Sequence, residues 1–328
     1  MNKKIIWGVI GAGSVCEIKS VPAMYKLPGS RVKSIMRRNA FAAEDFAKRH
    51  GVHSWTQNAD FLFKDNEINA IYIATPPDTH AYYTKKAAQA GKIVYVEKPM
   101  ARDHDECIKM ISVCEKYAVP LFVAYYRRAL PHFLRIKKLI DSGYLGNIQK
   151  VDIFFNRSLR DMEKDHPEKI WRLNPKVSGG GYFHDLASHQ LDLLDFFFGP
   201  VIKVQACAKN VSGYYSVPDN VRADLLFKDN VVAKGYWNFA SSKTEVKDEI
   251  LIEGDKGHLA FSTFAHTRIS GVSDDFGAIN ESYQLPQHIQ ECLIKTIILE
   301  IQGKGKCPST GVSAARTSKV MDIVCNYP

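Results

Sequence analysis

A lysine and an aspartate–histidine pair are the side chains in this sequence best suited to moving a proton. Lys98 stands in the run Glu97-Lys98-Pro99, while Asp185 and His189 lie four residues apart in a predicted helix and so share one helix face. An imidazole titrates near neutral pH, and a lysine held in a cofactor cleft can take part in proton transfer. Each feature alone has a simpler interpretation, since Lys-Pro is a common charged turn and an Asp–His pair at this spacing is more often a surface pair.

A glycine-rich turn lies between the first apolar run and a helix. Glycine lets the backbone turn tightly and approach a pyrophosphate, whose charge is stabilised at the helix N-terminus. The third position of the G-x-G-x-x-G/A pattern is Cys16, which leaves an ordinary tight turn as the alternative. The candidate phosphate-binding residues are Gly8, Gly11, Gly13, Ser14 and Val15.

Two arginines follow the second predicted strand, where NAD-binding folds usually place an acidic residue. Arg37 and Arg38 offer no carboxylate for the ribose hydroxyls, but their guanidinium groups suit the 2′-phosphate of NADP. NADP is therefore the favoured cofactor. The alternative is that both arginines are surface residues and that NAD is accepted.

Further cofactor-binding candidates follow two later strands and precede the predicted helix of the second half. Ligands of open α/β sheets bind beyond the carboxyl ends of the strands, where these residues stand. They are Thr75, Pro76, His80, Glu97 and Lys98, together with Trp171 and Arg172.

The order of apolar segments predicts the elements that position these residues. Short apolar runs at residues 5–10, 32–36, 71–75, 93–96 and 121–124 alternate with amphipathic stretches, which indicates a parallel sheet covered by helices. Asp103 and Glu106 resemble a capping box for a helix over residues 103–117. From about residue 146, β-rich segments at 149–156, 201–208, 221–227, 231–239 and 249–261 indicate a mostly antiparallel sheet. A helix over 182–198 interrupts it, and helical stretches after 286 and 313 end the chain.

Composition and charge restrict the class of protein. The chain of 328 residues favours two domains, and its 45% hydrophobic and 24% charged residues are typical of globular proteins. The net charge of +9 favours an anionic ligand, but the basic residues are scattered, so we expect no nucleic-acid partner. Seven irregularly spaced cysteines and no apolar run long enough for a membrane span predict a reduced, cytoplasmic protein with no membrane partner. The histidines show no metal-binding spacing, so no metal is expected.

Together these motifs resemble the Gfo/Idh/MocA oxidoreductase family, named for glucose-fructose oxidoreductase, inositol dehydrogenase and a rhizopine-catabolism protein. The resemblance covers nearly the whole chain, and the joint match is specific although each motif alone is weak. The matching segments are residues 8–13, 74–76 with His80, 90–92 leading to 97–99, Arg127 before Pro131, 143–146, 171–172 and 179–192.

The resemblance implies an α/β fold with a Rossmann dinucleotide-binding domain at residues 1–125. It implies an α+β domain with a large, mostly antiparallel open sheet at 126–328, whose final helix could pack back on the first domain. In the family, lysine, aspartate and histidine surround the reacting carbon beside the nicotinamide, which maps the catalytic residues to Lys98, Asp185 and His189. Which of Lys98 and His189 takes the proton stays open.

The implied activity is hydride transfer between NADP, or NAD, and a secondary alcohol or ketone of a sugar, polyol or inositol-like substrate. A homodimer or homotetramer is implied as well. The alternative is a dinucleotide-binding sensor of the same fold that regulates through protein contacts without turnover. Retention of all three catalytic positions favours the enzyme.

Overall fold

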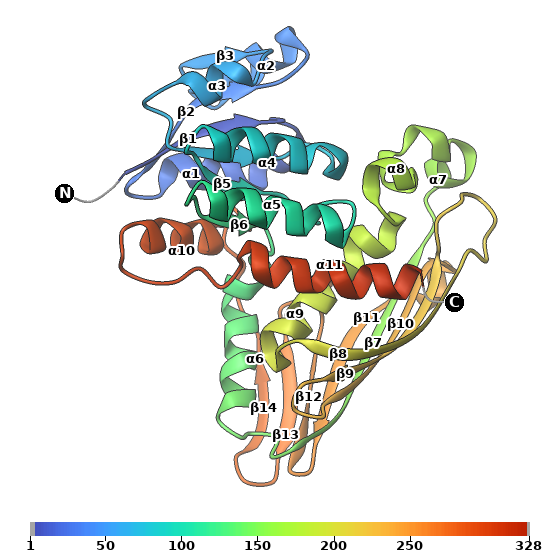
Figure 1. The fold of residues 1–328 in the computed structure, drawn as a ribbon. Helices are drawn as coiled ribbons and strands as arrows, with labels where there is room; N and C mark the ends of the chain where they lie inside the picture. Colours follow the sequence, from blue (N-terminus) through green and yellow to red (C-terminus); the bar gives the residue numbers. More distant parts are fainter. Residues whose placement is uncertain (1–3, 327–328) are drawn as a thin grey trace. The chain divides into compact units, whose positions relative to one another are not determined.

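The computed structural model describes residues 4–326 of the chain. They form two compact units (Figure 1). Of the described residues, unit 1 comprises 4–129 and 286–315, and unit 2 comprises 130–285 and 316–326. The chain therefore leaves unit 1, builds most of unit 2 and returns.

Unit 1 contains a six-stranded sheet in the order β3-β2-β1-β4-β5-β6, with all neighbouring strands parallel. The order of the strands reverses between β1 and β4, and open α/β sheets bind ligands at such a point. The predicted parallel sheet is confirmed, with one further short strand, β3. The strands are β1 (Ile5–Ile10), β2 (Ser30–Met36), β3 (Ser54–Thr56), β4 (Ala70–Ile73), β5 (Ile93–Val96) and β6 (Leu121–Val123).

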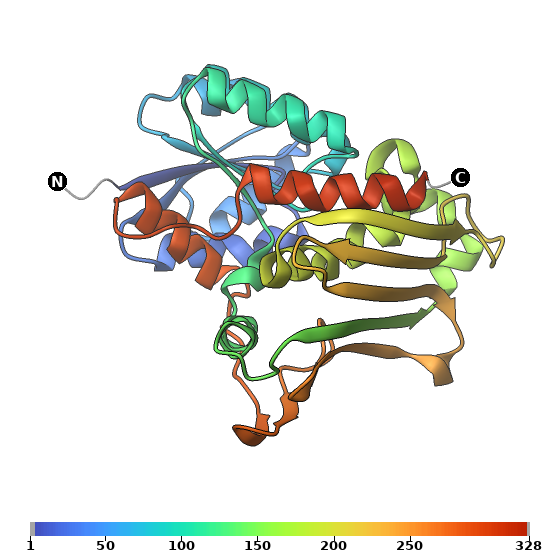
Figure 2. The same cartoon turned by 60° about the horizontal axis from the view of Figure 1, so that its bottom comes forward.

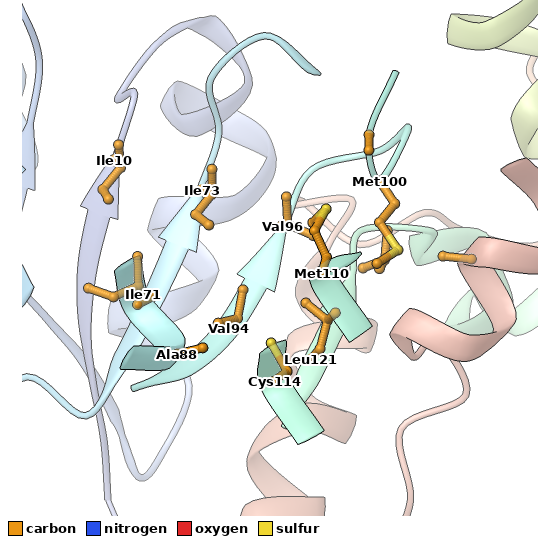
Figure 3. Close-up of a cluster of buried hydrophobic side chains, with 14 of the residues drawn as sticks. Ile10, Ile71, Ile73, Ala88, Val94, Val96, Met100, Met110, Cys114 and Leu121 are labelled. Atoms are coloured by element: carbon orange, nitrogen blue, oxygen red, sulfur yellow. The ribbon is translucent and has the colours of Figure 1, made fainter. Parts of the chain in front are cut away.

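Apolar side chains from the strands and helices of unit 1 form one buried cluster (Figure 3). In it, Ile71, Val94 and Leu121 of the sheet lie with Ala88 of α4 and Met110 of α5. Continuous apolar strands are expected where a parallel sheet is buried on both faces. The helices of this unit are α1 (Val21–Lys26), α2 (Ala40–Arg49), α3 (Asp60–Lys64), α4 (His80–Gln89), α5 (His104–Lys116) and α10 (Glu291–Ile301), with 3₁₀ turns η2 (Pro77–Thr79) and η3 (Tyr126–Ala129).

The start of α5 follows its sequence pattern closely. The Asp103 side chain accepts a hydrogen bond from the Glu106 backbone N–H at 2.8 Å and caps the helix. The Glu106 carboxylate accepts from the Arg102 backbone N–H at 3.1 Å, one residue before the position that a capping box requires. The predicted cap by Asp103 is confirmed. The Glu106 side chain, however, bonds to the backbone N–H of Arg102 and not to that of Asp103.

The segment that returns to unit 1 packs against the first turns of the chain. The His288 ring lies 2.7 Å from the carbonyl of Ile18 and 2.8 Å from the Lys26 ammonium, and α10 packs on α1. Thr310 forms an isolated bridge with Phe122 of β6. Residues 286–315 thus form hydrogen bonds with the first turns of the chain and with β6. Helix α11 (Gly311–Cys325) begins here and continues into unit 2.

Unit 2 contains a large sheet, seen in Figure 2. It has eight strands in the order β14-β13-β12-β11-β7-β10-β9-β8. Only β7 and β10 pair in parallel, so the predicted, mostly antiparallel sheet is confirmed. The strands are β7 (Ile148–Ser158), β8 (Val201–Lys209), β9 (Asn220–Phe227), β10 (Val232–Ser241), β11 (Lys247–Gly254), β12 (Gly257–Phe261), β13 (Ile269–Ser273) and β14 (Gly277–Glu281).

The β-rich segment predicted at 249–261 is a hairpin rather than one strand. It turns between Gly254 and Gly257, which pair with each other at the end of β11 and β12. A Cβ at Gly254 would lie 2.1 Å from the Leu145 carbonyl oxygen, so only glycine fits this close approach. The sequence prediction also lacked β13 and β14.

Unit 2 carries one long buried helix, and it begins with a π-helical turn. The turn η6 (Phe183–Ala187) leads directly into α9 (Ser188–Phe198), which confirms the predicted helix over 182–198. A second π-helical turn, η1 (Cys16–Ser20), follows the glycine-rich turn of unit 1. Such turns are rare and concentrate at functional sites. The other elements of unit 2 are α6 (Pro131–Asp141), α7 (Asp161–Asp165), η4 (Pro167–Lys169), η5 (Trp171–Leu173), α8 (Pro175–Ser178) and η7 (Lys243–Glu245).

Candidate active site

The glycine-rich turn of unit 1 is wedged between three strand ends. Gly11 has a φ of +84°, and its backbone N–H donates to the Met36 carbonyl at 3.0 Å. A Cβ at Gly11 would lie 2.7 Å from the Thr75 side chain and 2.9 Å from the backbone of Ala74. Both the conformation and the space therefore require glycine here.

Gly13, Ser14 and Val15 lead into the helical turn η1 and leave space around its N-terminus. A Cβ at Gly13 would meet only the Gly11 carbonyl oxygen, at 3.7 Å, so the space beside Gly13 is open. Ser14 is exposed and Val15 is half-buried. An open, glycine-lined helix start is what a pyrophosphate needs. These residues fit the phosphates of a dinucleotide.

Gly8 and Cys16 belong to the packing beneath this turn. Gly8 is buried within β1, where a Cβ would lie 3.1 Å from Ile71 and 3.2 Å from Ile68. The structure thus does not bring Gly8 to the phosphate-binding surface. Cys16 is fully buried, and its burial, with the nearby Glu97 carboxylate, raises the pKa of its thiol to about 12. The small Cys16 side chain therefore fits the buried space that Gly or Ala usually occupies at the third position of the pattern.

Arg37 and Arg38 lie immediately after β2, beside the glycine-rich turn in the strand order. The Arg37 backbone N–H donates to Thr56 at 3.0 Å, and the Arg38 carbonyl accepts from the Gln57 side chain at 2.8 Å. Arg37 is half-buried and Arg38 is exposed. The backbone is therefore fixed while two cationic side chains stand at the sheet edge.

His80 joins two of the predicted cofactor segments through backbone contacts. Its Nε2 lies 2.7 Å from the Thr75 carbonyl oxygen, and its Nδ1 lies 3.1 Å from the carbonyl of Pro99 and 3.2 Å from that of Met100. Burial lowers the pKa of His80. The ring holds the turn after β4 to the turn after β5, so His80 positions Thr75, Pro76 and Lys98.

A buried polar network lies under the turn that carries Lys98. Tyr72 Oη and Gln290 Nε2 each donate to Glu97 Oε1 at 2.6 Å, and Tyr95 Oη donates to Gln290 Oε1 at 2.7 Å. The Lys98 backbone N–H donates to Glu97 Oε2 at 3.3 Å. Burial and the adjacent Glu97 raise the pKa of Tyr72 well above its usual value, which keeps its hydroxyl a donor. Glu97 thus anchors the Lys98 turn inside unit 1.

Replacing Gln290 by leucine should lower the free energy of unfolding by roughly 2–4 kcal/mol, because it leaves the buried Glu97 carboxylate and the Tyr95 hydroxyl each short of a partner. Urea denaturation measures this loss. Gln287→Leu is the matched control, since Gln287 is exposed and accepts one bond from Lys26 at 3.3 Å. Equal stability of the two variants would contradict the anchoring role of the network.

Lys98 and Lys92 flank the same strand but differ in their surroundings. Lys92 is buried, and its ammonium donates to the carbonyls of Asp65 and Ile68 at 2.8 and 2.7 Å. Burial lowers the pKa of Lys92. Lys98 is half-buried at the carboxyl end of β5. Of these two lysines, Lys92 is therefore structural and Lys98 is placed at the ligand edge of the sheet.

In unit 2, the predicted acid Asp185 is oriented by an arginine. The Arg172 Nε donates to Asp185 Oδ2 at 2.7 Å, and the Arg172 guanidinium lies over the Trp171 ring, 4.3 Å from its centre. The Asp185 side chain is 14% exposed. Arg172, which the sequence assigned to cofactor binding together with Trp171, thus contacts the acid of the η6 turn, and Trp171 packs against Arg172.

His189 follows one turn later and is almost fully buried in unit 2. Its exposed fraction is 3%, and its ring meets Phe264 edge-on at 5.8 Å between centres. The next residue, Gln190, accepts a hydrogen bond from Trp237 Nε1 at 2.6 Å. The start of α9 is therefore held by Phe264, which contacts His189, and by Trp237, which donates to Gln190.

Sequence reasoning gave no structural role to Glu163, which supports the η6 turn from outside its motif. The Arg157 guanidinium donates to Glu163 at 2.6 and 2.8 Å, and Tyr182 Oη donates to the same carboxylate at 2.5 Å. Glu163 is 1% exposed. Burial and this carboxylate raise the pKa of Tyr182 to about 12. Arg157 and Tyr182 lie 6 and 19 residues from Glu163, outside the motif that contains Asp185, so that motif does not reveal them.

Within residues 4–326, no group of three or more His, Cys, Asp and Glu side chains could hold a metal ion. Over the same span, none of the helices has the length and apolar character needed to cross a membrane.

Comparisons with known proteins match both units. The family model described as "Oxidoreductase family, NAD-binding Rossmann fold" matches residues 5–125, and "GFO/IDH/MocA C-terminal domain" matches residues 133–260. Oxidoreductase P35 of Formosa agariphila is 38% identical over 329 residues, covering 99% of each chain. Inositol 2-dehydrogenase of Rhizobium meliloti is 29% identical over 59% of this chain and 54% of its own.

A solved structure shares the fold over nearly the whole chain. Levoglucosan dehydrogenase in complex with NADH and levoglucosan superposes with a TM-score of 0.87 at 21% identity, covering 98% of this chain and 96% of that one.

Proposed function

The chain belongs to the GFO/IDH/MocA family of oxidoreductases, and on this basis we propose that it transfers hydride between a nicotinamide cofactor and the CH–OH carbon of a sugar, polyol or inositol-like substrate. The relatives named inositol 2-dehydrogenase and levoglucosan dehydrogenase support this substrate class.

One observation carries the proposal. The glycine-rich turn after β1, the arginines after β2, Thr75 after β4 and Lys98 after β5 all lie at the carboxyl edge of one parallel sheet. This edge, at the point where the strand order reverses, is where such sheets bind dinucleotides. His80 ties Thr75 to the Lys98 turn.

The residues divide into cofactor-binding and catalytic groups. Gly11, Gly13, Ser14 and Val15 would hold the pyrophosphate, and Thr75 and Pro76 would line the same edge. The bound nicotinamide supplies the carbon that gives or takes the hydride. The chain must then position the substrate and move one proton.

The catalytic group is Lys98, Asp185 and His189. Lys98 would hydrogen-bond the reacting oxygen and stabilise the negative charge that develops on it. His189 would exchange the proton, because imidazole is effective near neutral pH. Asp185, oriented by Arg172, would bind a neighbouring hydroxyl of the substrate.

Arg37→Asp should shift the cofactor preference from NADP towards NAD, by about tenfold or more in the ratio of dissociation constants. The change removes a guanidinium suited to the 2′-phosphate and supplies a carboxylate for the ribose hydroxyls. Nicotinamide fluorescence with NADPH and NADH measures the ratio. Lys48→Asp, an exposed position on α2, is the control with the same change in charge. An unchanged ratio in the Arg37 variant would remove Arg37 from the 2′ position.

The direct test of the proposed function is a titration with NADPH and with NADH, followed by a turnover screen of cyclic polyols and ketosugars. We expect tight binding of NADPH, weaker binding of NADH and turnover of at least one cyclic substrate. Failure to bind either cofactor, with no nucleotide released on denaturation, would overturn the proposal.

We also propose that the enzyme is cytoplasmic and assembles at least as a dimer through the open face of the unit 2 sheet. On the outer face, Phe154 and Tyr236 stack with 5.4 Å between ring centres, and Tyr236 is 36% exposed. A contiguous apolar patch exposed on a sheet face favours association with another molecule. Light scattering of Tyr236→Lys against the parent protein tests this, and an unchanged mass would contradict it.

A further inference from the structure

A thiol, an imidazole and a carboxylate meet in unit 2, apart from the residues assigned above to catalysis. Cys325 Sγ lies 4.0 Å from His184 Nδ1, and His184 Nε2 lies 3.9 Å from Asp322 Oδ1. Asp322 and Cys325 are three residues apart on α11 and so share one helix face. His184 stands in the η6 turn and contacts both.

The imidazole of this cluster is fixed by its packing. His184 is 3% exposed, and a Cβ on Gly180 would lie 2.2 Å from its Nδ1. Its ring also meets Phe183 edge-on at 6.2 Å between centres. Residue 180 must therefore be glycine, because any side chain there would collide with the His184 ring. The His184 Nδ1 is the ring nitrogen nearest to Cys325 Sγ.

The electrostatics of the cluster favour a charged imidazole. Burial opposes that charge, but Asp322 and Cys325 outweigh it and raise the pKa of His184 to about 9. At neutral pH the ring is thus an imidazolium. A cation in contact with a sulfur stabilises the thiolate, which is the nucleophilic form of cysteine.

The other cysteines provide an internal comparison. Burial raises the thiol pKa of Cys16 and Cys114 to about 12 and that of Cys307 to about 11, so these thiols stay protonated. Cys207 is exposed on the edge strand β8, whereas Cys325 is only partly exposed. Simple accessibility therefore predicts that Cys207 reacts faster than Cys325.

We propose that Cys325 is a modification site, a cysteine whose sulfur the adjacent His184 ring activates as a nucleophile toward hydroperoxides and small electrophiles. In the reaction with a hydroperoxide, the sulfur attacks the terminal oxygen, so that an S–O bond forms and the O–O bond breaks. Sulfur is oxidised to the sulfenic acid and the hydroperoxide is reduced. The departing hydroxide or alkoxide takes the proton of the His184 imidazolium and leaves as water or alcohol.

The test measures iodoacetamide alkylation of the native full-length protein at pH 7, peptide by peptide, by mass spectrometry. Cys325 should react at least tenfold faster than the more exposed Cys207. His184→Gln should slow Cys325 by about the same factor and leave Cys207 unchanged. Asp322→Asn, which keeps the ring in place, should slow Cys325 by a smaller factor and covers the case in which His184→Gln does not fold.

A second reagent tests the oxidation itself. Hydrogen peroxide followed by dimedone, which traps sulfenic acids, should label Cys325 before Cys207. Alkylation of Cys325 no faster than that of Cys207, or a rate that neither variant changes, would overturn the proposal. Fast alkylation without dimedone labelling would overturn its hydroperoxide step.

Discussion

Replacing Lys98 by alanine is expected to lower kcat by about 10²–10⁴-fold while NADPH and NADH still bind. The side chain stands at the carboxyl end of β5, and the buried Glu97 and the His80 ring hold its backbone in place without its ammonium group. The variant therefore keeps the turn and loses only the cation. Steady-state kinetics and a cofactor titration on the same sample separate the two effects.

The control for this variant is Lys85→Ala, which removes an exposed lysine from α4. It should bind cofactor and turn over substrate as the parent does. A Lys98→Ala protein that keeps more than a tenth of the parent kcat would argue against a catalytic Lys98. One that retains its full biological effect without turnover would favour the sensor interpretation.

The second large effect is expected at the glycine-rich turn, where Gly13→Val should weaken both NADPH and NADH by about 100-fold or more and leave the fold intact. The space beside Gly13 is open, and its backbone is not left-handed, so the protein itself tolerates a side chain. The pyrophosphate does not, because it must approach the backbone closely. Thermal unfolding and cofactor titration of one preparation give both results.

Gly11→Val is the matched comparison for this prediction. Its φ of +84° and the 2.7 Å approach of Thr75 make any side chain strained, so this variant should also lose roughly 3 kcal/mol or more of stability. Unimpaired cofactor binding by Gly13→Val would remove the pyrophosphate from this turn. Equal destabilisation by both variants would show that the turn is only structural.

The parallel sheet was predictable because its strands are continuous apolar runs that become fully buried, as Ile71 and Val94 show. The hairpin at 247–261 was not predictable, because the segments on both sides of its turn have the same β-rich composition. The only local signal was the pair Gly254 and Gly257, whose need for glycine comes from the Leu145 and Val272 carbonyls that approach them.

In the candidate site, too, some residues were predictable from the sequence and others were not. Motifs indicated Lys98, Asp185 and His189, because their residue types and spacing are local. The groups that hold them are not local: Gln290 reaches Glu97 across 193 positions of sequence, and Arg172 reaches Asp185 across 13. His184 directly precedes Asp185 in the chain, but its contact with Cys325 spans 141 positions. Such pairs depend on the tertiary fold alone.

The return of residues 286–315 to unit 1 affects how the protein emerges from the ribosome. Synthesis delivers β1 to β6 first, yet Gln290, which joins Tyr95 to Glu97, is made only after residues 130–285 of unit 2. Domains usually fold in order as they are synthesised, but the bond from Gln290 to Glu97 in unit 1 can form only after residues 130–285 of unit 2 have been translated. During that interval the nascent chain presents the Glu97 carboxylate without the amide that later covers it.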